Sequence, residues 1–155
     1  MTGSNDVDTL AGPHEIFARM QQRWLANTVS TFGDDLAEDV VIETPFAAPG
    51  RPRRVEGRAA CRAFTEAGRA ALPARFEECR NVVVHETADP ETIVVEYELA
   101  GTVTTTNRSA AASFIAVLRV RGGQVVLWRE YQDVLAIAQA LGQPPALPGT
   151  DEASQ

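Results

Sequence analysis

The spacing of apolar residues changes at Pro73, and this change limits the folds available to the chain. Before Pro73, apolar side chains recur every three or four residues, as they do on one face of a helix. After it, stretches rich in valine, threonine and aromatic residues follow one another up to residue 132, which is typical of strands. Helices followed by a long antiparallel meander predict an α+β domain.

The pattern places each expected element by residue range. Helices are expected over residues 13–27, 30–37, 58–72 and 133–141. Strands are expected over residues 40–42, 76–87, 91–105, 110–121 and 124–132, with a proline- and arginine-rich loop over 45–56. Gly122-Gly123 predicts a tight hairpin, and Asp133 is suited to cap the closing helix.

The length of 155 residues suits a single domain with a core of its own. We expect a flexible leader over residues 1–12, the domain over 13–142 and a disordered tail over 143–155. The leader is polar and acidic, which is unlike a secretory signal, so a cytoplasmic location is expected. No apolar run approaches the length of about 20 residues that a membrane span needs.

Charge and composition exclude several classes of function. The net charge of −7 argues against binding to nucleic acid or to anionic membranes. The chain contains no lysine, which excludes Schiff-base chemistry and the lysine of phosphate-binding loops. Only His14 and His85 are present, so neither a metal site nor a Ser/His/Asp set is expected, and we expect no cofactor. Cys61 and Cys79 are expected to be small buried hydrophobes.

The hairpin at Gly122-Gly123 predicts which residues share a face of the sheet. A two-residue turn pairs Val120 with Val125 and continues without interruption. The other face of these two strands would then carry Ser113, Ile115, Val117, Val126, Trp128 and Glu130. Both faces are largely apolar, so helices are expected to cover one face and a second copy of the chain the other. We therefore expect a homodimer through the sheet.

Three glutamates are candidates for acid–base chemistry. Glu96 and Glu98 point the same way on their strand, and they converge with Glu130 if the two faces join. Like charges in an apolar cavity raise the pKa of at least one carboxyl, which suits a general acid beside an ionised base. The alternative is that these glutamates lie on a solvated face. Tyr97 and Tyr131 have the opposite orientation and are expected on the dimer face.

Several runs carry a resemblance to a known superfamily. They are Thr44-Pro45-Phe46, Val55-Glu56-Gly57-Arg58, the last strand Gly123–Asp133, and the closing segments Asp133-Val134-Leu135 and Gln139–Gly142. Over residues 13–142 the chain resembles the nuclear-transport-factor-like superfamily of ketosteroid isomerases, limonene-epoxide hydrolases and SnoaL-like polyketide cyclases. The resemblance implies a cone in which N-terminal helices pack on a curved, mostly antiparallel sheet around an apolar pocket.

The functional residues of these relatives carry over only in part. Thr44 and Trp24 stand where the isomerases have their aspartate and tyrosine, so steroid isomerisation is not implied. Of the epoxide hydrolase set, the last-strand carboxylate matches Glu130, whereas the Arg-x-Asp pair falls on Glu96 and Glu98 and the water-holding positions on Ile42 and Thr44. The cyclases need one acidic residue near the end of the last strand, which Glu130 or Asp133 supplies.

The resemblance thus implies a cofactor-free cyclase or isomerase that acts on a polyketide-like or other apolar secondary metabolite. Its catalytic candidates are Glu130, Glu96, Glu98 and Asp133, and its expected pocket residues are Trp24, Thr44, Phe46, Ser113, Ile115, Val117 and Trp128. The alternatives are a non-enzymatic binding module for an apolar molecule, an epoxide hydrolase with an altered catalytic set, and a structural dimer with a filled cavity. The arginines at 51, 53, 54, 58 and 62 form either a solvated loop or a gate that binds a substrate carboxylate or phosphate.

Overall fold

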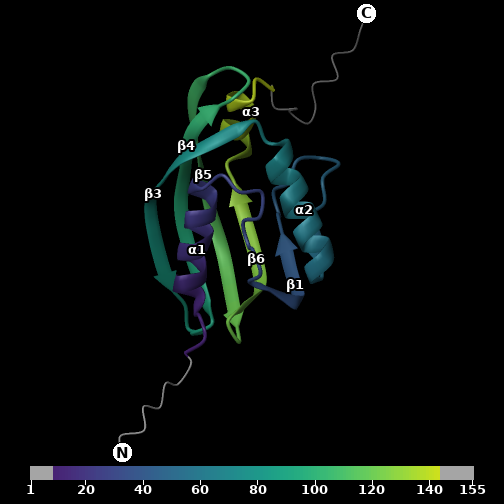
Figure 1. Cartoon of the computed structure of the whole chain (residues 1–155), viewed down its shortest axis with the longest axis vertical. Helices are drawn as coiled ribbons and strands as arrows, with labels where there is room; N and C mark the ends of the chain where they lie inside the picture. Colours follow the sequence, from purple (N-terminus) through teal and green to yellow (C-terminus); the bar gives the residue numbers. More distant parts are fainter. Residues whose placement is uncertain (1–8, 144–155) are drawn as a thin grey trace, which may run out of the picture.

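The computed structural model describes residues 9–143 and contains an α+β domain (Figure 1). In this part of the chain the helices are α1 (Pro13–Leu25), α2 (Arg58–Ala71) and α3 (Val134–Ala140). The strands are β1 (Leu36–Glu43), β2 (Arg54–Glu56), β3 (Ala74–Glu86), β4 (Thr92–Val103), β5 (Arg108–Arg121) and β6 (Gln124–Gln132). The predicted fold class is confirmed.

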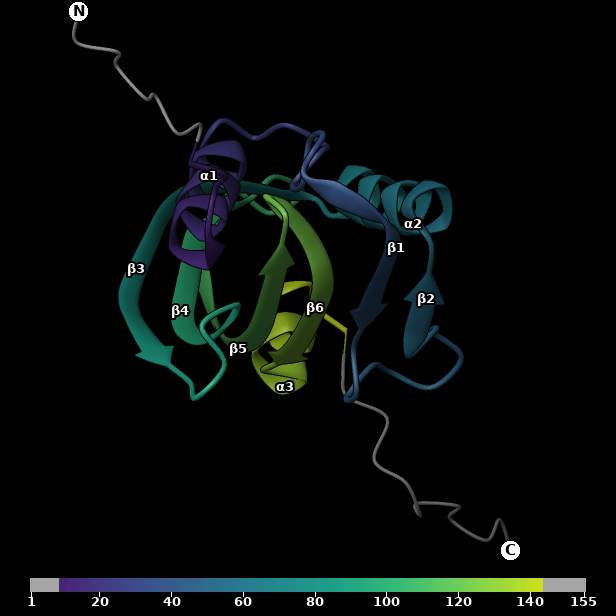
Figure 2. The ribbon, with the colours of Figure 1, turned by 90° about the horizontal axis from the view of Figure 1, so that it is seen from below.

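The six strands form one sheet in the order β2-β1-β6-β5-β4-β3. Strands β3 to β6 form the expected antiparallel meander, and β1 runs parallel to β6. The sheet curves strongly, with α1 lying against β3, β4 and β5, and α2 against β1 and β2 (Figure 2). The inner face of the curved sheet therefore holds the core.

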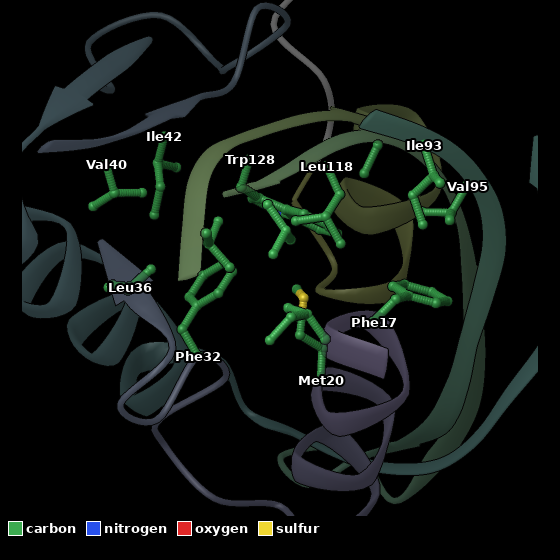
Figure 3. Close-up of a cluster of buried hydrophobic side chains, with 14 of the residues drawn as sticks. Phe17, Met20, Phe32, Leu36, Val40, Ile42, Ile93, Val95, Leu118 and Trp128 are labelled. Atoms are coloured by element: carbon green, nitrogen blue, oxygen red, sulfur yellow. The ribbon is translucent and has the colours of Figure 1, made fainter. Parts of the chain in front are cut away.

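Helix α1 supplies the central part of the core because its apolar residues fall on one face. Pro13 begins the helix at a position where its missing N–H is not needed. Ile16, Phe17, Met20 and Trp24 recur at helical spacing and are each at most 6% exposed. Around them, the inner side chains of β1, β4, β5 and β6 complete one cluster (Figure 3).

Two expected elements are corrected by the structure. Residues 30–35 form turns instead of a helix, and β1 already begins at Leu36. The Asp35 carboxylate accepts hydrogen bonds from Arg19 and Arg23 of α1, and these tertiary contacts outweigh a weak local helical pattern. The loop expected over 45–56 ends in β2, which pairs with β1 in antiparallel fashion.

The Gly122-Gly123 hairpin is confirmed, but the predicted pairing holds only near the turn. Val120 pairs with Val125 as expected, whereas Arg119 pairs with Leu127, so β6 carries one extra residue between these pairs. Such a bulge inverts the side-chain alternation beyond it. As a result Trp128 and Glu130 share the inner face with Leu118, Ala116 and Phe114, and the predicted face assignment is wrong.

The predicted leader and tail lie mostly outside the described residues. Positions 1–8 of the leader and 144–155 of the tail are not covered. Within residues 9–143, no helix is long and apolar enough to cross a membrane.

Candidate functional site

Glu130 lies on the inner face of β6 and is held there by two neighbouring side chains. The Tyr97 hydroxyl donates to Glu130 Oε2 over 2.7 Å, and Gln132 Nε2 donates to Glu130 Oε1 over 2.7 Å. Tyr97 reaches Glu130 from β4, across the intervening strand β5, where Ala116 is paired with Glu130. The small alanine side chain leaves room for this contact between second-neighbour strands.

Tyr97 is fixed by aromatic rings on both of its faces. Its ring stacks on Trp24 of α1 at a centroid distance of 5.1 Å and on Phe114 of β5 at 5.2 Å. The residue is 2% exposed, so its hydroxyl is desolvated apart from the bond to Glu130. This stack orients the hydroxyl before any ligand arrives, which is the preorganisation that an acid–base site requires.

Burial raises the pKa of the Glu130 carboxyl above its ordinary value. Hydrogen bonds from Tyr97, Gln132 and Trp128 oppose this effect because they stabilise the carboxylate. Burial and the neighbouring Glu130 charge hold the pKa of Tyr97 well above its ordinary value, so the phenol stays protonated and acts as the donor. The three donors to Glu130 are therefore all neutral groups.

Glu130 is partly exposed, although the core beneath it is filled. Trp24 and Trp128 are 6% and 5% exposed, and Trp128 packs edge-on against Phe32 at 5.9 Å. Figure 3 shows buried side chains of this core, among them Phe17, Met20 and Trp128, between α1 and the sheet. The exposed part of Glu130 therefore lies on the solvent side of this aromatic cluster.

Two surface hollows are present elsewhere on the molecule, and Glu130 lines neither of them. One, of about 770 Å³, lies beside α2 and is lined by charged side chains that include Glu38, Arg58 and Glu66. The other, of about 390 Å³, lies over β3, β4 and β5. Their mixed charges give no common electrostatic preference for a ligand.

The structure does not bring the three predicted glutamates together. Glu96 and Glu98 point to the outer face, where Glu96 Oε2 lies 2.6 Å from His85 Nε2 and Glu98 pairs with Arg80. Alternation along β4 instead directs Tyr97 inward. The predicted convergence is wrong because the bulge in β6 puts Glu130 on the face of Tyr97 and not on that of Glu96 and Glu98. The predicted position of Tyr97 on the dimer face is wrong because α1 covers the Tyr97 side of β4.

The predicted pocket residues divide between the two faces. Trp24 and Trp128 lie on the inner side, as expected for core residues. Ser113, Ile115 and Val117 lie on the outer face, opposite Glu98, Glu96 and Val94 of β4. Two others belong to the loop after β1: Thr44 donates its N–H to the Arg53 carbonyl, and Phe46 packs on Tyr131 while 61% exposed.

Asp133 serves as the cap of α3. Its Oδ1 accepts a hydrogen bond from the Ala136 N–H over 3.0 Å, which confirms the predicted N-cap. The residue is exposed and follows directly on β6. The capping of α3 therefore explains why an aspartate stands at position 133, without any role beside Glu130.

The predicted arginine cluster separates into different contacts. Arg54 pairs with Glu43 and Glu56, and Arg58 donates to the Leu36 carbonyl. Arg62 donates to the Gly33 carbonyl. Arg51 and Arg53 are exposed in the loop. Three of the five side chains thus connect β1, β2, α2 and the turns before β1, and only Arg51 and Arg53 remain for a gate.

Within the part of the chain that the structure describes, no three His, Cys, Asp or Glu side chains gather in a way that could hold a metal ion. Cys61 is fully buried and Cys79 partly buried, and both are free thiols. Gln21 donates to the Cys79 sulfur over 3.7 Å.

Sequence reasoning missed Tyr97 and Gln132 as partners of Glu130. Gln132 stands two residues after Glu130 and shares its face, a relationship that alternation along the predicted strand over residues 124–132 already implied. Tyr97 carried no comparable signal, since its contact depends on the bulge and on the small Ala116.

Comparisons with known proteins agree with this architecture. Residues 17–128 match the model of the SnoaL-like domain. The chain is 36% identical over 102 residues to an uncharacterised PhzA/B-like protein from Pseudomonas aeruginosa, covering 66% of this chain and 70% of the relative. It is 30% identical over 105 residues to the uncharacterised protein YesE of Bacillus subtilis, covering 68% and 70%.

Solved structures show the same fold. A candidate isomerase from Bacillus subtilis superimposes with a TM-score of 0.75 at 25% identity, covering 84% of this chain and 92% of that one. A candidate polyketide cyclase from Pseudomonas putida KT2440 gives a TM-score of 0.65 at 17% identity, covering 84% and 98%. An NTF2-like protein from Burkholderia xenovorans LB400 gives a TM-score of 0.60 at 22% identity, covering 85% of this chain and 98% of that one.

Proposed function

The chain belongs to the SnoaL-like domain family, and on that premise we propose that it is a cofactor-free isomerase or cyclase whose acid–base group is Glu130. The observation that carries this proposal is the partly exposed Glu130 carboxyl, which accepts hydrogen bonds from Tyr97 and Gln132 and has a raised pKa. A carboxyl with a pKa nearer neutrality can both take and return a proton at the pH of the cell. Similarity to a candidate isomerase and to a candidate polyketide cyclase supports the same class of reaction.

In the proposed mechanism, Glu130 as a carboxylate takes a proton from carbon next to a substrate carbonyl. The electron pair remains on the substrate as an enolate, and the resulting acid returns the proton at another carbon, at a leaving oxygen, or at the oxygen of a second carbonyl whose carbon the enolate has attacked to close a ring. Tyr97 remains a neutral donor throughout because its own pKa is so high. It holds Glu130 Oε2 and so leaves Oε1, beside Gln132, for the proton transfer.

The surroundings of Glu130 favour an apolar substrate with oxygen functions. Phe114, Trp24 and Trp128 surround the Tyr97–Glu130 pair, and no cation acts on the pKa of Glu130 among the described residues. We place the reaction in the cytoplasm, where the two free thiols would remain reduced.

Solvent-deuterium incorporation tests this proposal without knowledge of the product. The purified protein is incubated in D₂O with enolisable cyclic ketones and β-dicarbonyl compounds, and the deuterium content of each compound is followed by mass spectrometry. We expect exchange with the wild type and a loss of roughly 100-fold or more with Glu130→Gln, which cannot accept the proton. Equal exchange rates in both proteins would exclude Glu130 as the base.

A second candidate function is binding of an apolar molecule without turnover. The packed aromatic cluster favours it, because the inner side chains next to Glu130, Trp24, Tyr97 and Trp128, lie against one another. Native mass spectrometry with terpene-, polyketide- and steroid-like ligands separates the two functions. A stable complex whose ligand stays chemically unchanged with wild type, together with no deuterium exchange, supports the binding function.

A further inference from the structure

Both carboxylate oxygens of Glu130 are already bonded in the free protein, and this limits how Glu130 can change its protonation state. Oε2 accepts from Tyr97 and Oε1 accepts from Gln132. When the carboxyl takes up a proton on Oε1, that oxygen becomes an O–H donor and a much weaker acceptor for the Gln132 N–H. A buried donor left without an acceptor destabilises the protonated state.

A glutamine side chain can form a hydrogen bond with either protonation state of a carboxyl, which a donor-only group cannot do. Its side-chain amide carries a donor and an acceptor, which exchange places when the amide turns by half a rotation. Gln132 lies at the end of β6, next to the exposed Asp133, and is itself only partly buried. Its partly exposed side chain has no such restraint as the Tyr97 ring, which is held between two other rings.

We propose that Gln132 is a positioning residue that serves both protonation states of Glu130, donating through Nε2 to the carboxylate and accepting through Oε1 from the carboxylic acid. The proposal rests on Glu130 acting as the acid–base group. The proton passes between the substrate and Glu130 Oε1, and Gln132 neither gains nor loses one. Glu130 can then cycle between its two states without a lost hydrogen bond in either.

Among the described residues, few charged or titratable side chains lie near Glu130. Tyr97 of β4 is the titratable group bonded to it. Cys79 of β3 contributes to the raised pKa of Tyr97. The strand β5 presents Ala116 and Phe114, and α1 presents Trp24. On the opposite face of the sheet, Arg129 pairs with Glu43. The proton affinity of Glu130 is therefore set by its burial and by its neutral donors, of which Gln132 can turn.

The experiment makes two measurements on each variant, both without any substrate. Carbon-13 NMR of protein labelled in glutamate and glutamine gives the pKa of Glu130. Urea unfolding at one pH below that pKa and one pH above it gives the stability of each protonation state. The variants are Gln132→Met, which removes both donor and acceptor, and Gln132→Asn, whose shorter amide cannot reach Glu130. Gln124→Met, at the other end of the same strand, is the matched control. Because no turnover is measured, the result is independent of whether Glu130 is catalytic.

The bond donated by Gln132 lowers the pKa of Glu130 only while the amide keeps the orientation of the structure, and the turned amide stabilises the acid as well. We therefore expect Gln132→Met to leave the pKa of Glu130 within about half a pH unit of wild type while lowering the urea midpoint at both pH values, because one hydrogen bond is lost in each state. In the wild type, the Gln132 side-chain amide signals should change with the same midpoint as Glu130. A rise in the pKa of Glu130 by about one pH unit, with the urea midpoint lowered only above that pKa, would show a fixed donor and overturn the proposal. No change in either quantity would also overturn it, and Gln132→Asn decides the question if the methionine variant does not fold.

Discussion

The Tyr97 hydroxyl and the Glu130 carboxylate meet at 2.7 Å although their strands are separated by β5. The contact is possible because the inner face of β5 presents the small Ala116 between them, and because Trp24 and Phe114 clamp the tyrosine ring. It joins a carboxyl with a raised pKa to a phenol that remains protonated. Stability, proton affinity and catalysis should therefore all depend on this pair and on the packing around it.

Tyr97→Phe should keep the aromatic stack and remove the hydrogen bond to Glu130. Since that bond stabilises the carboxylate, its loss raises the pKa of Glu130 further and lowers the unfolding free energy at neutral pH by about 1.5–3 kcal/mol. Urea unfolding and carbon-13 NMR of glutamate measure these two effects. Tyr131→Phe, on the outer face beside Phe46, is the control and should leave the pKa of Glu130 unchanged.

Glu130→Gln should change stability in a pH-dependent way. A carboxyl whose pKa is raised on folding binds its proton more tightly in the folded state, so its contribution is present at low pH and is lost as the pH rises through the folded-state pKa. The variant has no such loss. Melting curves from about pH 4 to about pH 8 should therefore show its stability improving relative to wild type as the pH increases; a constant difference would mean that the pKa of Glu130 is not raised.

Trp24→Ala should destabilise the domain strongly because Trp24 is 6% exposed and packs on Phe17, Tyr97 and Trp128. Removing a buried aromatic ring costs about 3–5 kcal/mol through lost contacts and the remaining cavity. The neighbouring Leu25 is 43% exposed, so Leu25→Ala should cost about 0.5 kcal/mol or less. Chemical denaturation compares the two, and similar losses would contradict the described packing.

We also propose that the outer face of the sheet forms a homodimer. Ile115 and Val83 are 44% and 47% exposed on this face, and the Glu96–His85 and Glu98–Arg80 pairs surround them with both signs of charge. Light scattering after size-exclusion chromatography should show a dimer for wild type and a monomer for Ile115→Asp. Val134→Asp, at an equally exposed site on α3, should remain dimeric. A wild-type monomer at micromolar concentration would refute the interface.

The order and type of the main elements could be predicted from the sequence because apolar spacing and turn residues determine them locally. Pro13, Gly122-Gly123 and Asp133 mark a helix start, a hairpin and a helix cap, and each acts there as predicted. The turn at residues 30–35 could not be predicted because its structure depends on Asp35 bonding to two arginines of α1, a contact between distant segments.

The composition of the site could be predicted only in part. The resemblance pointed to Glu130, but its partners were assigned to the wrong face because one additional residue in β6 reverses the alternation beyond Val125. No local residue preference in Val125-Val126-Leu127 signals a bulge. Because of the bulge, Glu130 lies on the same face as Tyr97 and opposite to Glu96 and Glu98.

The acid–base role of Glu130 depends on its pKa, which carbon-13 NMR titration of the free protein can measure, with the signal assigned by the Glu130→Gln variant. We predict a single titration with a midpoint above the ordinary glutamate value of about 4.3, because burial outweighs the three hydrogen bonds to the carboxylate. A midpoint at or below that value would mean that Glu130 is ionised throughout the physiological range. It would then hold Tyr97 in place as a structural carboxylate, and the proposed acid–base role would be lost.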